Sequence, residues 1–397
     1  MKYVVLVPDG AADYPLDELA GKTPLEAAAT PNMDRLAREG TCGLVQIIPP
    51  ERHPGSDIGN LEIFGYDSRV HYTGRSPLEA ASMGVELADD EIAFRCNLIQ
   101  RDGDTLVDYS AGHISSEEGA ELIAALAPAL SSDDIRFYPG VGYRHLMVYR
   151  HGPEELVSYP PHDIMGESIA AHLPTGVGQE KIRALMEAAE PILAGAEINA
   201  KRVAAAQAPA NAIWLWGSGR ALRLQSLQEK HDLRGGVISA VDLVRGIGLS
   251  AGLEVIEVPG ITGYLDTNYS GKAEYALEAL ERMDLVYVHV EAPDEAGHNG
   301  DWQAKQQAIE DFDRLVAGPI MDGLKKYETA RVLMTPDHRT PIALRTHSRE
   351  PVPFVLWGEG FAADGVESYG EQAGAAGALQ IEHGHELMEY LVGERQA

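Results

Sequence analysis

The sequence predicts an α/β fold in which a mostly parallel sheet is flanked by helices and carries an inserted, smaller α+β domain. Three observations lead to this prediction. The run YVVLV at residues 3–7 is short and wholly apolar, as in a buried strand of a parallel sheet. Strand-like and helix-like segments alternate through the second half of the chain, which is typical of a sheet covered on both faces. Residues 86–185 instead combine several short strands with one clear helix.

The N-terminal segment is predicted to run from strand to helix to strand. A turn at 8–10, Pro-Asp-Gly, ends the first strand. A helix is expected over 31–40 because Thr30 can serve as its N-cap, a proline occupies its first position and a glycine ends it. GLVQII at 43–48 is the next expected strand.

Five later runs are also strand-like, and helical segments separate most of them. They are NAIWLW (211–216), LEVIEV (253–258), DLVYVHV (284–290), ARVLMT (330–335) and VPFVLW (352–357). We expect these strands to join the first one in the main sheet. The Gly/Ala-rich stretch 362–379 is expected to be a loop.

The middle of the chain has a different pattern. Its strand-like segments are FRCNLI, TLVDY, IRFY and RHLMVYR, and its helix is SSEEGAELIAALAPAL, which Ser115 or Ser116 can cap. We therefore predict a core formed by residues 1–85 and 186–397, interrupted by an inserted domain at 86–185.

Composition narrows the possible partners and the compartment. Acidic residues number 61 against 32 basic residues, and the net charge of −29 argues against nucleic acid or an anionic membrane as a partner. The two cysteines, Cys42 and Cys96, form no ligand motif and predict no disulfide framework. The apolar run in residues 1–8 is too short for a signal-peptide core, and no run has the length of a membrane helix. We expect a cytoplasmic protein.

Carboxylates and imidazoles follow several of the predicted strands. Taken singly, each has an ordinary explanation, such as capping a turn or lying in an exposed loop. Taken together they would all lie at the edge of the sheet where ligands bind in open α/β folds. These residues are Asp9, Asp294, His298, Asp337, His338 and His347. Oxygen and nitrogen ligands without cysteine favour two divalent ions such as Mn²⁺, Co²⁺ or Zn²⁺.

Ser56 is the candidate nucleophile for such a site. It follows a Pro-Gly turn and opens a predicted helix, SDIGNLEIFG, whose N-terminus would stabilise an alkoxide or a phosphoserine. An ordinary serine N-cap is the alternative, and the residues alone do not separate the two.

Many motifs then occur in one order: GKTPLEAAATPNMDRLAREG, GSDIGNLEIFGYD, YTGRSPLEAAS, FRCNLI, SAGHIS, PPHDI, ISAVDLVRGIG, GITGYLDTNYSGKAEYAL and the DH…H segment. Along nearly its whole length the chain resembles the archaeal-type cofactor-independent phosphoglycerate mutases of the alkaline phosphatase superfamily. The resemblance implies an alkaline-phosphatase-like, metal-binding core at 1–85 and 186–397, and a substrate-covering domain at 86–185.

The resemblance also implies two ion positions, one held by Asp294, His298 and His347 and the other by Asp9, Ser56, Asp337 and His338, with Ser56 as nucleophile. The ions are expected to be Mn²⁺, with Co²⁺, Zn²⁺ or Mg²⁺ as alternatives. The residues flanking the Asp-His pair are usually small or flexible in the family. Here they are Pro336 and Arg339, which puts the stiffness and local charge of this loop in doubt.

Candidate substrate-binding residues fall in or near the family-like motifs, and arginine matches the geometry of phosphate and carboxylate. They are Arg75, Arg95, Asn97, His113, Arg144, His162 and Lys272. His145 or Asp163 is the expected general base. A surface salt bridge is the alternative role for each of these residues.

The implied reaction is the interconversion of 3-phosphoglycerate and 2-phosphoglycerate in glycolysis and gluconeogenesis. The substrate is a small phosphorylated carboxylic acid, and Ser56 carries the phosphoryl group while the trapped glycerate turns, so no 2,3-bisphosphoglycerate is required. The sequence does not indicate an oligomeric state. Three alternatives stay open: a phosphatase or phosphodiesterase, a kinase of a small alcohol such as homoserine, and a non-catalytic metal-binding protein.

Overall fold

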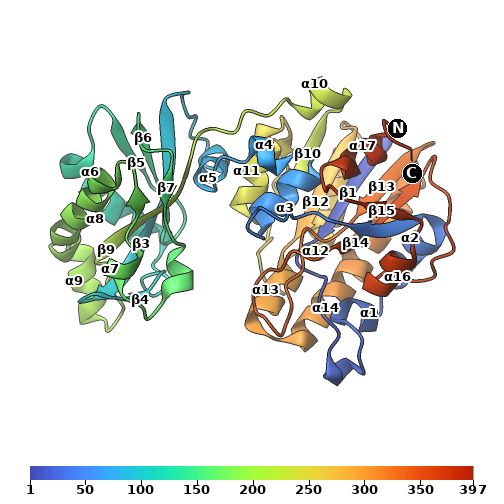
Figure 1. Ribbon diagram of the computed structural model, residues 1–397, viewed down its shortest axis with the longest axis horizontal. Helices are drawn as coiled ribbons and strands as arrows, with labels where there is room; N and C mark the ends of the chain where they lie inside the picture. Colours follow the sequence, from blue (N-terminus) through green and yellow to red (C-terminus); the bar gives the residue numbers. More distant parts are fainter. Residues whose placement is uncertain (397) are drawn as a thin grey trace. The chain divides into compact units, whose positions relative to one another are not determined.

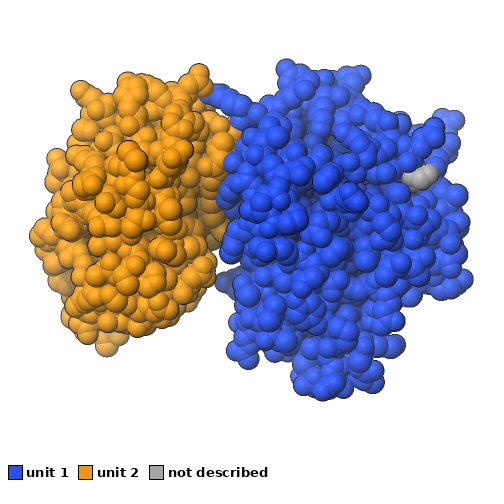
Figure 2. All heavy atoms as spheres, in the orientation of Figure 1, with its two compact units in different colours: residues 1–72, 223–397 blue, residues 73–222 orange. Residues whose placement is uncertain are grey.

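The computed structural model describes residues 1–396, and the chain divides into two compact units. The first unit consists of residues 1–72 and the chain from 223 onward, and the second consists of residues 73–222 (Figure 2). The second unit is larger than the predicted insertion of 86–185. It also includes the helix at 76–82 and the strand at 212–219, because both pack against the long strand at 91–102.

An eight-stranded sheet forms the centre of the first unit, in the order β11-β10-β12-β1-β13-β14-β2-β15 (Figure 1). Its strands are β1 (Lys2–Pro8), β2 (Thr41–Val45), β10 (Gly235–Ile238), β11 (Glu254–Val255), β12 (Leu285–Val290), β13 (Ala330–Met334), β14 (Val352–Gly358) and β15 (Leu379–Ile381). β14 runs antiparallel to β13 and β2, and the other neighbouring pairs are parallel. The predicted mostly parallel sheet is confirmed.

The register of the three central strands positions the site. β1 lies between β12 and β13, with Val7 opposite His289 and Leu6 opposite Met334. Because all three strands are parallel, their carboxyl ends meet at one edge of the sheet. The residues that follow each strand are therefore brought close together although they are up to about 330 positions apart in sequence.

Helices cover both faces of this sheet (Figure 1). The α-helices of the first unit are α1 (Pro24–Ala27), α2 (Pro31–Glu39), α3 (Ser56–Ile63), α4 (Ser68–His71), α10 (Leu227–His231), α11 (Asp242–Ser250), α12 (Tyr269–Ala279), α13 (Ala292–Asn299), α14 (Trp302–Phe312), α15 (Gly318–Leu324), α16 (Glu371–Ala376) and α17 (Glu386–Val392). A 3-10 turn at Asp17–Leu19 and a π-helical turn at Asp313–Ala317, which joins α14 to α15, complete the set.

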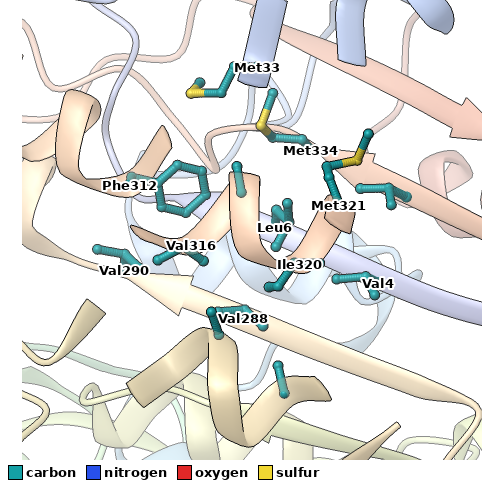
Figure 3. Packing of buried hydrophobic residues seen from close by; sticks show 14 of the residues in the cluster. Val4, Leu6, Met33, Val288, Val290, Phe312, Val316, Ile320, Met321 and Met334 are labelled. Carbon is teal, nitrogen blue, oxygen red and sulfur yellow. The ribbon is translucent and has the colours of Figure 1, made fainter. Parts of the chain in front are cut away.

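One face of the sheet packs against α14, α15 and the π-helical turn between them. Figure 3 shows Leu6 of β1 and Val288 of β12 beside Phe312, Val316 and Ile320, and all five side chains are buried. Burying such a side chain is worth about 1.5–3 kcal/mol. The alternating residues of the same strands point to the opposite face, which α3, α11 and α17 cover.

The second unit is an α+β domain built on an antiparallel sheet. Its strands are β3 (Glu91–Asp102), β4 (Thr105–Asp108), β5 (Ile135–Tyr138), β6 (Arg144–Arg150) and β9 (Ala212–Gly219), with a separate pair β7 (Leu156–Val157) and β8 (Thr175–Gly176). Its helices are α5 (Ser76–Ser82), α6 (Ser116–Leu130), α7 (Ile169–His172), α8 (Gln179–Ala194) and α9 (Glu197–Ala204), with a 3-10 turn at Pro161–Ile164. Ser115 caps α6 by accepting a hydrogen bond from the Glu118 amide.

Two expectations about individual elements are wrong. NAIWLW was expected in the main sheet, but β9 pairs antiparallel with β3 inside the second unit, where Trp214 and Leu215 lie in its core. The stretch 362–379 is not only a loop, because it contains α16. Within residues 1–396, none of the helices combines the length and apolar character needed to cross a membrane.

Candidate active site

Seven predicted side chains meet at the carboxyl edge of the main sheet. Asp9 follows β1, Asp294 lies in the first turn of α13 just beyond β12, and Asp337 follows β13. His298 also lies on α13, the loop after β13 adds two further imidazoles, and the start of α3 adds a hydroxyl. The full set is Asp9, Ser56, Asp294, His298, Asp337, His338 and His347. Their assembly depends on the parallel register of the three central strands.

One group consists of Asp294, His298 and His347. The four-residue spacing on α13 turns Asp294 and His298 to the same side, and His298 Nε2 lies 3.2 Å from an Asp294 carboxylate oxygen. His347 Nε2 lies 3.5 Å from the other oxygen of Asp294 and 2.9 Å from His298 Nε2. Three donor atoms therefore converge on one small volume.

The second group consists of Asp9, Asp337 and His338, with Ser56 beside them. His338 Nε2 lies 3.6 Å from Asp9 Oδ1 and 3.5 Å from Asp337 Oδ2. The ring centroids of His338 and His347 are 4.2 Å apart, so the two groups adjoin. His338 Nδ1 faces the Thr340 hydroxyl at 3.2 Å, which leaves Nε2 directed toward the carboxylates.

Ser56 is the first residue of α3, but its side chain does not cap the helix. The N-cap position belongs to Gly55, and the α3 terminus carries no side-chain cap hydrogen bond. The Ser56 hydroxyl instead lies 3.1 Å from His338 Nε2 and 3.5 Å from Asp9 Oδ2. This placement disfavours the ordinary N-cap interpretation and leaves the positive end of the helix beside the hydroxyl.

Gly10 and Gly59 allow the backbone to come close to the acidic side chains. Gly10 has a φ of +59°, and a Cβ there would lie 2.6 Å from Asp294 Oδ1. A Cβ on Gly59 of α3 would lie 2.6 Å from the Asp337 carbonyl oxygen. Larger residues at either position would separate the elements that carry the site.

Burial and like charges dominate the electrostatics of the site. Burial, together with the negative charges of Asp337 and Asp294, raises the pKa of Asp9 well above its ordinary value. Burial would also raise the pKa of Asp294, but the imidazoles of His347 and His298 outweigh it and hold that pKa well below the ordinary value. Burial lowers the pKa of His338 to about 4, which keeps its ring neutral.

This donor set fits two divalent cations. Asp9 Oδ1 is buried and has no hydrogen-bond donor among the described residues, although it lies beside two further buried carboxylates. A cation would satisfy that oxygen and offset the clustered negative charge. The donors are carboxylate, imidazole and hydroxyl groups, which suit Mn²⁺, Co²⁺ or Zn²⁺. The role of the seven side chains as ligands stays a prediction.

The second unit gathers its own basic and aromatic residues around Trp216. The guanidinium of Arg95 lies 5.0 Å from the Trp216 ring and that of Arg75 lies 5.9 Å from it, while the His162 ring is 5.8 Å away. The Trp216 indole N–H donates to Asn97 Oδ1 at 3.0 Å. Four of the predicted substrate-binding residues therefore lie close together.

Arg144 joins this cluster through Tyr143. Its guanidinium lies 5.8 Å from the Tyr143 ring, which packs against Tyr109, and Tyr109 in turn packs against His162. Burial lowers the pKa of Arg95 to about 10, despite the opposing effect of Glu79, whose carboxylate accepts a hydrogen bond from Arg95 at 2.5 Å. The cluster thus carries more positive than negative charge.

Three other residues, predicted to bind substrate or to act as general base, lie in positions less suited to those roles. His145 is buried, its Nδ1 accepts a hydrogen bond from the Gly140 amide, and burial lowers its pKa to about 4. Lys272 is fully buried and donates to the His289 carbonyl oxygen at 2.7 Å. His113 is exposed, with a φ of +51°. Asp163, by contrast, is exposed, and its Oδ1 lies 3.7 Å from His162 Nε2.

The contacts of Arg339 bear on the stiffness and local charge of the loop after β13. Its guanidinium donates to the Asp13 carbonyl oxygen at 2.9 Å and to the Pro351 carbonyl oxygen at 2.7 Å. It therefore ties the loop to two neighbouring segments. Pro336 precedes Asp337 without displacing it from the site.

Sequence reasoning missed the polar residues behind the carboxylates. His289 Nε2 lies 2.9 Å from Asp9 Oδ2, and Asn60 donates to Asp337 Oδ2 at 2.8 Å. The Tyr287 hydroxyl donates to Asn60. A signal was present, because Tyr287 and His289 are two apart in a strand that is otherwise wholly aliphatic.

Comparisons with known proteins find relatives of this chain along nearly its whole length. The family model described as 2,3-bisphosphoglycerate-independent phosphoglycerate mutase matches residues 37–199. The chain is 54% identical over 397 residues to a probable 2,3-bisphosphoglycerate-independent phosphoglycerate mutase of Geobacter sulfurreducens, covering 99% of this chain and 100% of that one. It is 52% identical to a second protein of that description from Methanothermobacter thermautotrophicus, covering 99% and 97%.

Two solved structures have the same fold. A protein from Pyrococcus horikoshii has a TM-score of 0.84 at 28% identity, with 100% of this chain and 98% of that chain covered. A cofactor-independent phosphoglycerate mutase from Thermoplasma acidophilum has a TM-score of 0.68 at 27% identity, covering 99% and 100%.

Proposed function

This chain belongs to the 2,3-bisphosphoglycerate-independent phosphoglycerate mutase family, and we propose that it interconverts 3-phosphoglycerate and 2-phosphoglycerate through a phosphoryl group carried on Ser56. It is an isomerase. The names of these relatives favour a mutase over the phosphatase, the kinase and the non-catalytic protein.

One observation carries the choice of nucleophile. The Ser56 hydroxyl lies at the uncapped start of α3, 3.1 Å from His338 Nε2 and 3.5 Å from Asp9 Oδ2. It is free of the capping bond that would occupy an ordinary helix-terminal serine. A phosphoryl group on this oxygen would be stabilised by the backbone N–H groups at the start of α3.

Two divalent cations, Mn²⁺ in our proposal, would neutralise the phosphoryl oxygens and make the Ser56 hydroxyl more acidic when bound. Asp294, His298 and His347 would hold one of them. Asp9, Asp337 and His338 with Ser56 would hold the other. Ser56 forms a bond to phosphorus while the bond between phosphorus and the glycerate oxygen breaks. The other hydroxyl of glycerate then attacks phosphorus, and the Ser56 oxygen leaves.

Each phosphoryl transfer also moves a proton between Ser56 and a glycerate oxygen, and a side chain must carry that proton. The proton lost by Ser56 goes to the departing glycerate oxygen, and the attacking hydroxyl returns a proton in the second transfer. We assign the carrier role to Asp163, which is exposed beside His162. The buried and internally bonded His145 is the weaker candidate.

The basic cluster around Trp216 is our proposed anchor for the glycerate. Arg75, Arg95 and Arg144 supply planar guanidinium groups that match a carboxylate or phosphate. The surrounding Tyr143, Tyr109 and Trp216 rings restrict their motion. Retaining glycerate between the two transfers is what distinguishes a mutase from a phosphatase.

We further infer that the enzyme acts in the cytoplasm, in glycolysis and gluconeogenesis. Both cysteines are free and buried, which agrees with a reducing compartment. The proposed substrate is a small phosphorylated acid.

A coupled assay tests the proposed function. Purified protein is supplied with Mn²⁺ and 3-phosphoglycerate, and enolase detects 2-phosphoglycerate, with no 2,3-bisphosphoglycerate added. We expect turnover without that primer and little free phosphate. Release of phosphate as the main product would instead identify a phosphatase, and absence of both products would reject the proposed reaction.

A further inference from the structure

Strand β12 presents two unusual residues to the same face of the main sheet. Tyr287 and His289 are two positions apart, so their side chains share a face, and both are fully buried. Val286, Val288 and Val290 alternate with them and pack into the apolar cluster on the opposite face. A buried imidazole and a buried phenol are expensive to desolvate, so their hydrogen bonds deserve a functional explanation.

His289 connects Asp9 to a serine on the neighbouring strand segment. Its Nε2 lies 2.9 Å from Asp9 Oδ2, and its Nδ1 lies 3.1 Å from the Ser239 hydroxyl. The Ser239 oxygen already accepts a hydrogen bond from the Val241 amide at 3.0 Å, so its proton is available to His289 Nδ1. His289 is then left with its proton on Nε2, directed at Asp9.

Tyr287 is connected to Asp337 through the side chain of Asn60. Its hydroxyl donates to Asn60 Oδ1 at 2.7 Å, which fixes the orientation of that amide. The Asn60 amide nitrogen donates to Asp337 Oδ2 and to the Ser56 carbonyl oxygen, both at 2.8 Å. Stacking of Tyr287 on Phe64 holds the phenol in place, with ring centroids 4.0 Å apart.

Both carboxylates belong to the proposed ion position that also includes Ser56. His289 occupies Asp9 Oδ2 and leaves the buried Asp9 Oδ1 without a donor among residues 1–396. We propose that His289 and Tyr287, acting with Ser239 and Asn60, are positioning residues that orient Asp9 and Asp337 and thereby set the affinity of this one ion position. The inference rests on the proposed two-ion function.

The alternative is that His289 itself binds the ion, since ligand atoms of Asp9, His289 and Asp337 lie within 4.8 Å of one another. Glutamine separates the two roles. The amide N–H of Gln can replace the Nε2–H of His as a donor to Asp9, whereas the amide is a poor substitute for an imidazole lone pair on a metal.

Titration of metal-free protein with Mn²⁺, followed by the EPR signal of free Mn²⁺, tests this inference without an activity assay. Wild-type protein should bind two equivalents. His289→Ala should weaken one equivalent by about 10–100-fold and leave the other unchanged, as measured for other residues that orient metal ligands. His289→Gln should stay within a few-fold of wild type.

Tyr287→Phe is the companion variant, because it removes only the hydroxyl and keeps the packing against Phe64. It should weaken the same equivalent, less strongly than His289→Ala. Val288→Ala is the matched control, since this side chain points to the opposite face and should leave both equivalents intact.

Several outcomes would overturn the inference. Normal binding of both equivalents by His289→Ala and Tyr287→Phe would mean that the hydrogen bonds of His289 and Tyr287 do not affect ion affinity. Equal loss of binding in His289→Ala and His289→Gln would mean that His289 is itself a ligand. Fewer than two equivalents in wild-type protein would instead count against the proposed function. Far-UV circular dichroism identifies a variant that fails to fold, in which case Tyr287→Phe decides.

Discussion

The hydroxyl oxygen of Ser56 lies 3.1 Å from Nε2 of His338, although the two residues are 282 positions apart. Ser56→Ala removes the oxygen that would carry the phosphoryl group while leaving the Gly55 N-cap and the carbonyl that accepts from Asn60. We expect turnover to fall by about 10³-fold or more. Mass spectrometry of acid-quenched wild-type enzyme should find the phosphoryl group on the peptide that contains Ser56.

Ser115→Ala is the matched control for that variant. Its hydroxyl accepts from the Glu118 amide at 3.2 Å and caps α6. Its loss should cost about 1 kcal/mol of stability without changing the chemistry. Near-normal turnover in Ser56→Ala would remove Ser56 from the mechanism.

Metal removal should stop the reaction and destabilise the first unit. Without cations, the buried carboxylates of Asp9, Asp294 and Asp337 repel one another. EDTA should abolish turnover, and added Mn²⁺ or Co²⁺ should restore it. The unfolding free energy should rise by about 2.7 kcal/mol for each bound ion when free metal reaches 100 times the dissociation constant of its site. Full activity in protein verified to be metal-free by elemental analysis would contradict the two-ion site.

The strand ends of the core could be predicted because hydrophobic runs and turns are local features. Asp9, Asp294 and Asp337 each follow such a run, and the parallel topology brings them together. Which sheet a run joins depends on distant partners. NAIWLW has the same apolar pattern as the core strands, yet it pairs with β3, and the second unit accordingly extends to residue 222.

For the candidate site as well, residues that follow strands could be predicted, whereas residues inside buried elements could not. Residues in loops, such as His338 and His347, stand out because polar side chains after strands suggest function. His289 and Asn60 did not stand out, because a single polar residue within a buried element usually has a structural partner. His145 and Lys272 lie in family-like motifs, but their burial became apparent only from the fold.

A buried ion pair joins the loops behind the predicted metal ligands. The Lys305 ammonium is fully buried and donates to Asp13 Oδ2 at 2.7 Å and to the Thr340 carbonyl oxygen at 2.8 Å. Lys305→Ala leaves Asp13 as a buried, unpaired charge, so we expect a loss of about 3–5 kcal/mol in urea unfolding. Lys325→Ala breaks an exposed pair with Asp322 and should hardly move the midpoint.

His385 should make stability depend on pH. Its Nδ1 lies 2.9 Å from the buried carboxylate of Glu62, and this hydrogen bond raises the pKa of His385 above its ordinary value, with help from the charges of Glu62, Asp67 and Glu386. Because the folded-state pKa is the higher one, the stabilisation is complete below about pH 6.5 and disappears as the pH rises through the raised pKa.

His385→Gln should therefore lower the urea midpoint more at about pH 6 than at about pH 9. In a Glu62→Gln background the same substitution should lose this pH dependence, because the carboxylate that holds the proton is absent. A pH-independent effect of His385→Gln in the wild-type background would contradict the pairing of a protonated His385 with Glu62.

The basic cluster of the second unit should matter more for isomerisation than for hydrolysis. We expect the proposed core residues to suffice for forming and hydrolysing a phosphoserine, but a mutase must also keep glycerate bound until its second hydroxyl attacks. Arg144 and His162 lie in the cluster around Tyr143, Tyr109 and Trp216, which we propose as the glycerate anchor. Arg144→Ala and His162→Ala should lower mutase turnover by roughly 10-fold or more while phosphatase activity on a generic phosphate ester falls much less. The ratio of the two rates is the quantity to measure.

Arg150→Ala, at the other end of β6 and paired with Asp90, is the control and should leave the ratio unchanged. A proportional fall in both rates would mean that the cluster serves the phosphoryl transfer itself, and unchanged rates would mean that Arg144 and His162 do not hold glycerate.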